Sequence, residues 1–379
     1  MDQIDVLSRK LRRTYLETEI QSGLTHPEGF AERQSKYYEE GLFYLNRIIE
    51  RKILTIDLND ISNLASSDQF FNPINKITQA SFFATARAKA IERSLYGTVT
   101  DEVVELAMLL SIFTNLLDEI LDESPQVLTY GDMTFIKEVM TTQAWSETLR
   151  LPVIPIDPHR NPFATLLLEV MTSIIKIVVS QPVWKSDPVL KNQFLSASAA
   201  AFAAEEESTK YLDLARIPSD IPRAEKELQL KSVNWALAVS LAPACINGWP
   251  PDVSQDDFYL FTESLGTFGG WIDDLSDICV DYASNKWSNV FLEIYKLLSF
   301  LPSTTTDFPA TLRNCLVDQG VVRHLTQIGI NYHLDLLNKV ERMSVDPEPI
   351  KRIISDTVLL YISHSHNSPA ALVTSPDYG

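Results

Sequence analysis

Four aspartates lie close together in one stretch of the sequence: Asp273, Asp274, Asp277 and Asp281. On a helix, Asp273, Asp277 and Asp281 are spaced i, i+4, i+8, so their carboxylates share one face. Charges of one sign repel at such short range. Hard divalent cations, which carboxylate oxygens bind, usually neutralise clusters of this kind. The alternative is a solvated acidic face. The spacing therefore indicates a metal site. The residues in the preceding helical turns help to decide between this site and a solvated acidic face.

The turns that precede this row on the same face carry Gly266 and Gly270. A glycine in a helix interior costs about 1 kcal/mol relative to alanine, and one return for that cost is space. We therefore expect a hollow below the acids, which a solvated face would not need. The opposite face carries residues expected to pack in the core: Phe261, Leu265, Phe268, Trp271, Ile272, Leu275 and Cys279.

A second acidic cluster contains Asp118, Glu119 and Asp122. Asp118 and Asp122 are spaced i, i+4, so a helix would place both on one face. That face is apolar at Val104 and Met108 and becomes polar, then acidic, toward Asp118. A solvated face would stay polar along its length. The second cluster thus repeats the profile of the first, with carboxylates at one end of an apolar wall.

Two such helices facing each other would place both acid clusters at the mouth of a shared apolar cavity. Magnesium ions held there could bind a diphosphate and stabilise it as a leaving group. The apolar cavity would hold a hydrophobic chain and shield a carbocation from water. The residue types therefore predict metal-assisted ionisation of a diphosphate ester.

The scaffold is predicted to be all-α, since glycine is scarce at 12 of 379 residues and the apolar positions follow helical spacing. Helices are expected at about 1–25, 30–52, 78–96, 101–123, 131–146, 160–181, 187–214, 222–247, 254–283, 285–301, 308–343 and 347–365. The first of them carries basic side chains that we expect in solvent: Arg9, Lys10, Arg12 and Arg13. Short joins favour one bundle over 1–365, followed by a loose tail at 366–379.

Composition excludes several other classes of function. A formal charge of −18 argues against nucleic acid and anionic membrane surfaces as partners. No run of 18 uncharged apolar residues is present, and the N-terminus has no signal-peptide core, so we expect neither a membrane span nor secretion. Cys245, Cys279 and Cys315 lack metal-ligand spacing and are expected to be reduced thiols of a cytoplasmic protein.

The two clusters resemble the acidic motifs of class I isoprenoid synthases, the trans-prenyltransferases and class I terpene cyclases. Residues 118–122, DEILD, match the first DDxxD-type motif as DExxD, and residues 273–277, DDLSD, form a full DDxxD. Asp273, Asp277 and Asp281 also match the spacing of the cyclase NSE triad, with aspartate at each place. The resemblance covers about residues 80–290. Within the family, the chain is most similar to the class I terpene synthases.

This resemblance implies an isoprenoid-synthase-type helical bundle around a central apolar cavity. It implies a prenyl diphosphate substrate of C15, C20 or longer, and magnesium as cofactor, as three ions, with manganese as an alternative. By the same resemblance the catalytic acids are Asp118, Asp122, Asp273 and Asp277, and Glu119 and Asp281 complete the metal ligands. Related proteins are often dimers, so a homodimer is a further expectation.

The sequence departs from the elongating prenyltransferases of the family at two places. Their GxxFQ segment before the second motif is matched only at Gly266, since Gly269 and Gly270 stand where Phe and Gln would be. No arginine stands just after the first motif, where residues 124–126 are Ser, Pro and Gln, and the next basic residue is Lys137. A site for a second diphosphate therefore looks absent, which favours cyclisation. An elongating prenyltransferase and a catalytically silent helical partner subunit are the alternatives.

Four basic residues are candidates to bind the diphosphate. Lys286, just after the second cluster, is the best single candidate, and Arg87 and Arg93 precede the first cluster. A solvated surface position is the favoured explanation for either arginine taken alone. Lys210 could also reach a phosphate, although an i, i+4 pair with Glu206 would account for it.

Overall fold

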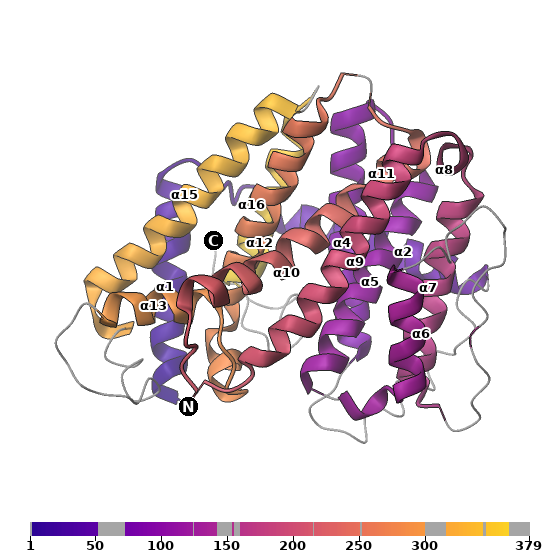
Figure 1. Ribbon diagram of the computed structural model, residues 1–379. Coiled ribbons are helices and arrows are strands. Elements are labelled where there is room, and N and C mark those ends of the chain that lie inside the picture. The colour runs from indigo at the N-terminus through magenta and orange to yellow at the C-terminus, as the bar shows by residue number, and fades with distance from the viewer. Residues whose placement is uncertain are drawn as a thin grey trace.

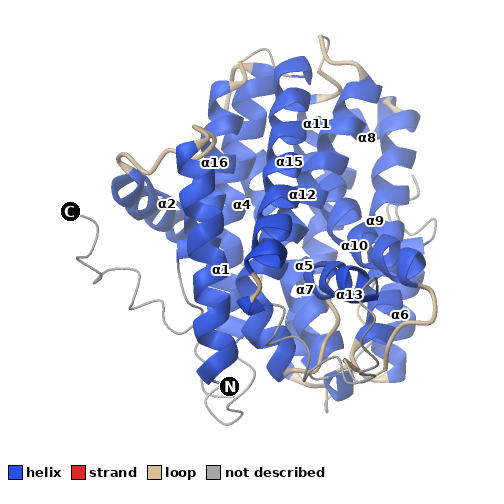
Figure 2. Ribbon diagram, turned by 90° about the vertical axis from the view of Figure 1, so that its left-hand side faces the viewer, coloured by secondary structure: helices blue, strands red, loops and turns tan. Residues whose placement is uncertain are grey.

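The computed structural model is all-α: helices joined by loops, and no strand, make up the part of the chain that it describes (Figure 2). It describes residues 2–51, 73–123, 125–141, 154, 160–214, 216–250, 252–299, 316–343 and 346–363. The first half contains α1 (Asp2–Gln21), α2 (Phe30–Glu50), α4 (Pro73–Tyr96), α5 (Asp101–Glu123), η1 (Pro125–Val127), α6 (Tyr130–Thr141), α7 (Pro162–Ser180) and α8 (Pro182–Ser186). The second half contains α9 (Pro188–Ser208), η3 (Thr209–Tyr211), α10 (Ile221–Ser240), α11 (Ala242–Asn247), α12 (Gln255–Ala283), α13 (Asn289–Ser299), α15 (Gln319–Met343) and α16 (Glu348–Ser363).

The predicted helices are present, with three corrections. The helix expected at 308–343 is interrupted at Asp318, after which α15 begins at Gln319. The helix expected at 222–247 is divided into α10 and α11, because Pro243 has no N–H to continue the helical hydrogen bonds. The helix expected at 187–214 ends at Ser208, whose Oγ bonds the carbonyl of Glu205 at 2.8 Å. The expected tail at 366–379, Cys315 and the outer ends of several predicted helices lie outside the described residues.

Helix α10 lies between the two acid-bearing helices. It packs against α12 and α9 and also contacts α5, and Figure 1 shows it crossing the front of the molecule obliquely. Helix α12 packs on its other sides against α1, α15 and α16, whereas α5 packs mainly against α4 and α7. Side chains of α10 can therefore reach acids on both α5 and α12.

Helix α7 is a core helix. Of the described helices, it alone is long and apolar enough to cross a membrane, but 72% of that stretch is buried inside the fold. Glu169 and Lys176 interrupt its apolar run. Burial among neighbouring helices accounts for its composition.

Helix α1 is held in place by a buried polar network around Glu19. Its carboxylate accepts hydrogen bonds from the hydroxyls of Tyr15 at 2.6 Å and Thr25 at 3.0 Å. Nδ1 of His333, on α15, lies 2.7 Å from the same carboxylate. Because α1 is fixed in this way, Arg12 is only 6% exposed. The expectation that all four basic residues of this helix face solvent is wrong for Arg12.

The glycines of α12 serve close packing, and the expected hollow below the acids is not what they provide. A Cβ on Gly266 would lie 2.4 Å from the Cα of Val233, and one on Gly270 would lie 2.6 Å from Oγ of Ser232. Both neighbours belong to α10. The missing side chains therefore let the backbone of α10 approach α12. This close packing offsets the lower helix propensity of the two glycines.

The variant Gly266→Ala is expected to lower the free energy of unfolding by about 1–3 kcal/mol, because its methyl group would push α10 away from α12. Gly269→Ala is the matched control, since its Cβ would meet nothing within 4 Å. It should raise stability by about 0.5–1 kcal/mol through helix propensity. Urea unfolding of both variants measures the difference, and equal effects would contradict the close approach of the two helices.

Candidate functional site

The first acid cluster lies near the C-terminal end of α5, above a buried apolar wall. Val104 and Met108 of that wall are fully buried, whereas Asp118 and Glu119 are half-buried. Asp122 belongs to α5, and its side chain lies outside the described residues. The predicted change from an apolar face to an acidic end is thus confirmed up to Glu119.

Lys231 of α10 joins this cluster to a buried carboxylate. Its Nζ donates a short hydrogen bond to Oδ1 of Asp118 and lies 3.0 Å from Oε2 of Glu205 on α9. Glu205 is 1% exposed and also accepts a hydrogen bond from Nε1 of Trp235 at 2.5 Å. Burial raises the pKa of Glu205 to about 7, and the positive charge of Lys231 limits that rise. The positive charge of Lys231 therefore offsets the negative charges of two acids from two different helices.

The second acid row occupies the last turns of α12. Asp273 is exposed, and Asp277 and Asp281 are half-buried. Burial raises the pKa of Asp281 well above its ordinary value, and the charges of Asp274, Asp277 and Asp273 raise it further. The four aspartates are thus close enough to oppose one another's ionisation, as the sequence predicts.

Asp274 has a structural role in this row. Its Oδ2 accepts hydrogen bonds from the backbone N–H of Asn289 at 2.7 Å and from Nδ2 of the same residue at 2.9 Å. Asn289 is the first residue of α13, so the carboxylate ties that helix to α12. Burial raises the pKa of Asp274 to about 6, and the charge of Lys231 opposes this rise. Lys231 therefore acts electrostatically on acids of both clusters.

Two further cations border the second row. Arg12 of α1 has its pKa lowered by burial, an effect that the negative charges of Asp5 and Asp277 oppose. The backbone N–H of Lys286 donates to the carbonyl of Asp281 at 2.8 Å, and the charge of Lys286 lowers the pKa of that aspartate. Lys286 is thus placed beside the acids as predicted, and Arg12 joins them unexpectedly.

The remaining predicted cations lie elsewhere. Lys210 is exposed and forms its ion pair with Glu207, while Glu206 pairs with Lys137 at 2.7 Å. The i, i+4 pair expected between Glu206 and Lys210 is therefore replaced by an i, i+3 pair. In the part of the chain that the structure describes, the hydrogen-bonded partner of Lys210 is Glu207 and not an acid of either row.

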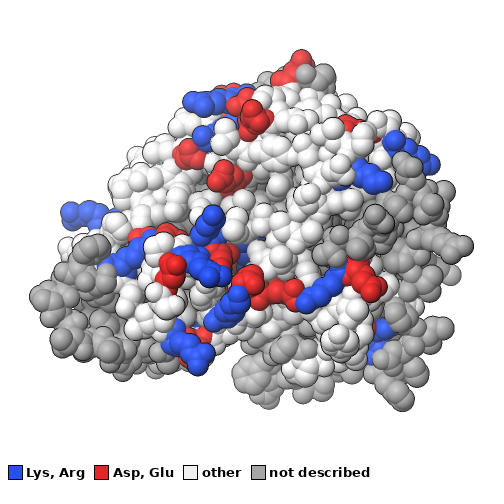
Figure 3. All heavy atoms as spheres, in the orientation of Figure 1, with Lys and Arg blue, Asp and Glu red and all other residues white. Residues whose placement is uncertain are grey.

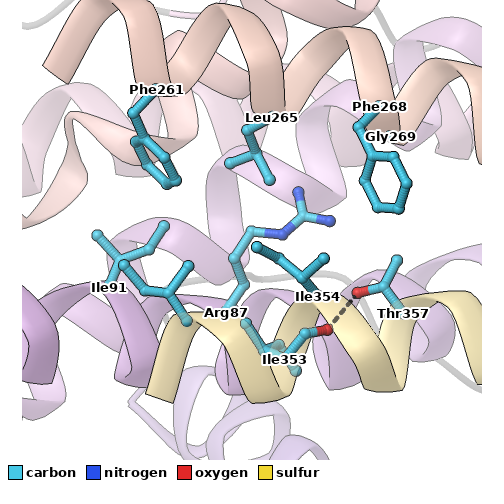
Figure 4. A pocket seen from close by; sticks show the side chains of 10 residues that line it. Arg87, Ile91, Phe261, Leu265, Phe268, Gly269, Ile353, Ile354 and Thr357 are labelled. Carbon is cyan, nitrogen blue, oxygen red and sulfur yellow. Dashed lines mark hydrogen bonds between the residues drawn. The ribbon is translucent and has the colours of Figure 1, made fainter. Parts of the chain in front are cut away.

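The two arginines of α4 are also separate from the acids. Arg93 is exposed. Arg87 points into an apolar pocket between α4, α12 and α16 (Figure 4). The pKa of Arg87 is lowered by burial, and no described aspartate or glutamate opposes that effect. The structure therefore does not bring Arg87 or Arg93 together with the predicted metal ligands.

The outer face beside this site carries charges of both signs. Figure 3 shows Lys, Arg, Asp and Glu side chains intermingled over α13 and the start of α10. Among them, Nζ of Lys296 lies 2.6 Å from both Glu225 and Glu293 and so links α13 to α10.

Sequence reasoning missed Lys231 and Glu205. One signal was available, because Lys231 and Trp235 are spaced i, i+4 on α10 and therefore share a face. A lysine on the face of a core tryptophan requires a buried partner. The partner could not be read from the chain, since Asp118 is 113 positions away from Lys231.

The donor set fits a hard divalent cation, since it consists of aspartate and glutamate oxygens. Among the described residues, however, no three candidate ligands are already gathered into a metal-binding group. Burial raises the pKa of Asp274 and of Asp281, and the charges of neighbouring aspartates raise both further, so a cation bound here would favour the ionised carboxylates. The oxygen ligands of the two acid clusters thus suit a divalent cation chemically, although the described side chains are not already grouped as a metal site.

The chain has also been compared with known proteins. No protein-family model matches it, and no curated protein matches its sequence.

Proposed function

We propose that this chain is a magnesium-dependent class I terpene synthase, an isoprenoid-synthase-type bundle that ionises a linear prenyl diphosphate and cyclises the resulting cation. One observation carries the proposal. Lys231 pairs with Asp118 of the first acid cluster and also acts on the pKa of Asp274 in the second. One lysine thus pairs with the first cluster and acts electrostatically on an acid of the second, the two clusters lying 155 positions apart in the sequence, counting from Asp118 to Asp273.

In this proposal the carboxylates of both helices hold the metal. Asp118, Glu119 and Asp122 would do so from α5, and Asp273, Asp277 and Asp281 from α12. Magnesium, when bound, offsets the negative charge of the departing diphosphate. Because these carboxylates repel one another, binding the ion is favoured by the relief of that repulsion.

The chain's own cations would bind the diphosphate. Lys231 and Lys286 flank the acids, and an ammonium group can exchange a carboxylate partner for a phosphate oxygen of similar hydrogen-bonding character. With Asp118 holding a metal ion, Lys231 would be able to donate to the diphosphate. Its link to Glu205 keeps the ammonium oriented toward the acids during that exchange. Lys231 thereby takes the place proposed from the sequence for Arg87 and Lys210.

Cyclisation is favoured over chain elongation by the residues around Gly266. Elongation requires a second diphosphate beside the first, and the close packing of Gly266 and Gly270 against α10 supports the inference from the sequence that a site for it is absent. The apolar face of α5 below Asp118 is the wall against which we place the prenyl chain. The central apolar cavity that the family resemblance implies belongs to the same proposal.

The test is incubation of the purified protein with prenyl diphosphates of C10, C15 and C20, with magnesium, followed by mass spectrometry of the extracted products. A cyclic hydrocarbon or alcohol and released diphosphate are expected from at least one substrate. Isopentenyl diphosphate added to the same mixture should not lengthen the chain. A longer prenyl diphosphate among the products would overturn the cyclase assignment in favour of elongation.

A catalytically silent partner subunit is the second candidate, favoured by the absence of a preassembled metal group among the described residues. Isothermal titration of the protein with an unreactive diphosphate analogue separates the two. Magnesium-dependent binding supports the enzyme, whereas no binding with or without magnesium supports the silent partner.

A further inference from the structure

Two loops that are distant in sequence meet directly after the second acid row. One of them joins α12 to α13 and contains Lys286, and the other runs from the end of η3 to α10. The backbone N–H of Trp287 donates to the carbonyl of Tyr211 at 2.9 Å. In the other direction, the N–H of Leu214 donates to the carbonyl of Asn285 at 2.6 Å. The residues on both sides of Lys286 are therefore bonded to the loop that leads to α10.

The side chain of Trp287 is the centre of this contact. It is only 4% exposed, and its Nε1 lies 3.1 Å from the carbonyl oxygens of both Asp213 and Arg216. Its ring packs edge-on against Tyr295 of α13, with the ring centroids 6.0 Å apart. A buried indole N–H requires an acceptor, and here two carbonyls of the other loop share it. The indole thus ties the loop after the acids to the loop before α10.

Asn285 provides a second attachment on the other side of Lys286. It is the only non-glycine residue in the described part of the chain with a positive φ, at 62°. Asparagine adopts this left-handed conformation more readily than most residues. Its Nδ2 donates to Oδ1 of Asp213 at 3.1 Å. The turn that leads into Lys286 is therefore held by the same segment that accepts from Trp287.

This double attachment matters because of what Lys286 carries. A lysine side chain is flexible, so the position of its ammonium group depends on how firmly its backbone is held. The charge of Lys286 lowers the pKa of Asp281 and so acts on the second acid row. A cation that is already in place binds an anion more tightly, because less conformational entropy is lost on binding. The contact between the loops therefore preorganises Lys286 for an anion bound at the acids.

We propose that Trp287 is a positioning residue for diphosphate binding, which acts by holding Lys286 beside the second acid row, with Asn285 in a supporting role. The loop before α10 thereby contributes to the site without supplying a ligand. This role rests on the proposed function, because it requires a diphosphate at the acid rows. It does not require Trp287 to touch the substrate.

Isothermal titration with an unreactive diphosphate analogue, in the presence of magnesium, tests the proposal. Trp287→Phe keeps an aromatic ring but removes the N–H, and it should weaken binding about 10-fold. Lys286→Met removes the cation itself and should weaken binding about 30-fold. The double variant Lys286→Met/Trp287→Phe should bind no more weakly than Lys286→Met, since no ammonium group is left to misplace.

Trp249→Phe is the matched control. Its Nε1 also donates to a backbone carbonyl, that of Val253 at 2.9 Å, but it lies near the start of α12 and the acids occupy the other end. This variant should bind the analogue as tightly as the wild type. It separates the role of Trp287 from the general effect of removing an indole N–H.

A second readout distinguishes positioning from a merely structural role. Magnesium alone should raise the melting temperature of Trp287→Phe as much as that of the wild type, because the acids remain in place. A general loss of structure would reduce this rise together with the affinity for the analogue. If Trp287→Phe does not fold, Asn285→Gly carries the test, since it keeps the left-handed backbone and removes only the amide. It should weaken binding about 3-fold, and only while Lys286 is present.

The positioning role is overturned if the folded variants among Trp287→Phe and Asn285→Gly bind the analogue as tightly as the wild type. It is also overturned if Trp287→Phe weakens binding equally with and without Lys286, because the indole would then act independently of the lysine. Both results leave the proposed function intact. A wild-type protein that does not bind the analogue with magnesium would instead overturn the proposed function and the positioning role together.

Discussion

The double variant Asp273→Asn/Asp277→Asn is expected to release diphosphate at least about 1,000-fold more slowly than the wild type. Amide oxygens carry no net charge, so the α12 wall would lose the attraction that holds magnesium. A loss of that size corresponds to about 4 kcal/mol of transition-state stabilisation. Phosphate release after pyrophosphatase treatment, followed with each prenyl diphosphate substrate, gives the rate.

The same variant should be more stable than the wild type when magnesium is absent. Asp281 has its pKa raised partly by the charges of Asp273 and Asp277, so removing them relieves repulsion in the folded state. Magnesium should raise the melting temperature of the wild type and have little effect on the variant. Loss of activity together with gained stability distinguishes a lost metal site from a misfolded protein.

Glu263→Gln provides the control for this experiment. Glu263 is an exposed acid on α12, before the row of aspartates, and its replacement should leave the rate unchanged. Wild-type diphosphate release by the double variant would show that the α12 acids do not hold the catalytic metal. The proposed enzymatic function would then lose its main support.

The helical scaffold and the acid rows could be predicted because they depend on short-range patterns. Apolar periodicity locates α5 and α12, and an i, i+4, i+8 spacing is enough to place Asp273, Asp277 and Asp281 on one face. Their mutual influence on pKa follows from that local geometry. The split between α10 and α11 was also within reach, since Pro243 stands inside the expected helix.

The partners of those acids could not be predicted, because they come from distant parts of the chain. Lys231 meets Asp118 only after α10 has packed between α5 and α12. Arg12 is indistinguishable from its exposed neighbours until α1 is fixed by Glu19. Likewise, the glycines of α12 could have formed a cavity or a close contact, and only the position of Val233 decides between them.

The variant Lys231→Met is expected to lower the free energy of unfolding by about 3 kcal/mol at pH 8. Methionine fills a similar volume but leaves Glu205, which is 1% exposed, as a buried carboxylate without its cation. Removing one partner of a buried ion pair typically costs about 3–5 kcal/mol. We take the lower end because Asp118 is 33% exposed and stays partly hydrated.

This loss should depend on pH in a definite direction. The folded-state pKa of Glu205 is about 7, above the ordinary value of 4.5, so the folded protein binds the extra proton between these two pH values. Its contribution to stability is therefore complete below about pH 4.5 and is lost as the pH rises through 7. Without Lys231, whose charge lowers this pKa, the carboxyl should take up its proton at still higher pH.

Urea unfolding at pH 8 and pH 5.5 provides the test. At pH 5.5 the protonated Glu205 needs no cation, and the cost of Lys231→Met should fall to about 1 kcal/mol. Adding Glu205→Gln should recover most of the loss at pH 8, since a neutral amide replaces the unpaired carboxylate. Lys226→Met, which replaces an exposed lysine of the same helix, should change the free energy of unfolding by less than about 0.5 kcal/mol.

A cost of Lys231→Met that is equal at both pH values would show that Glu205 does not depend on this lysine. The link between the two acid clusters would then have to come from another residue.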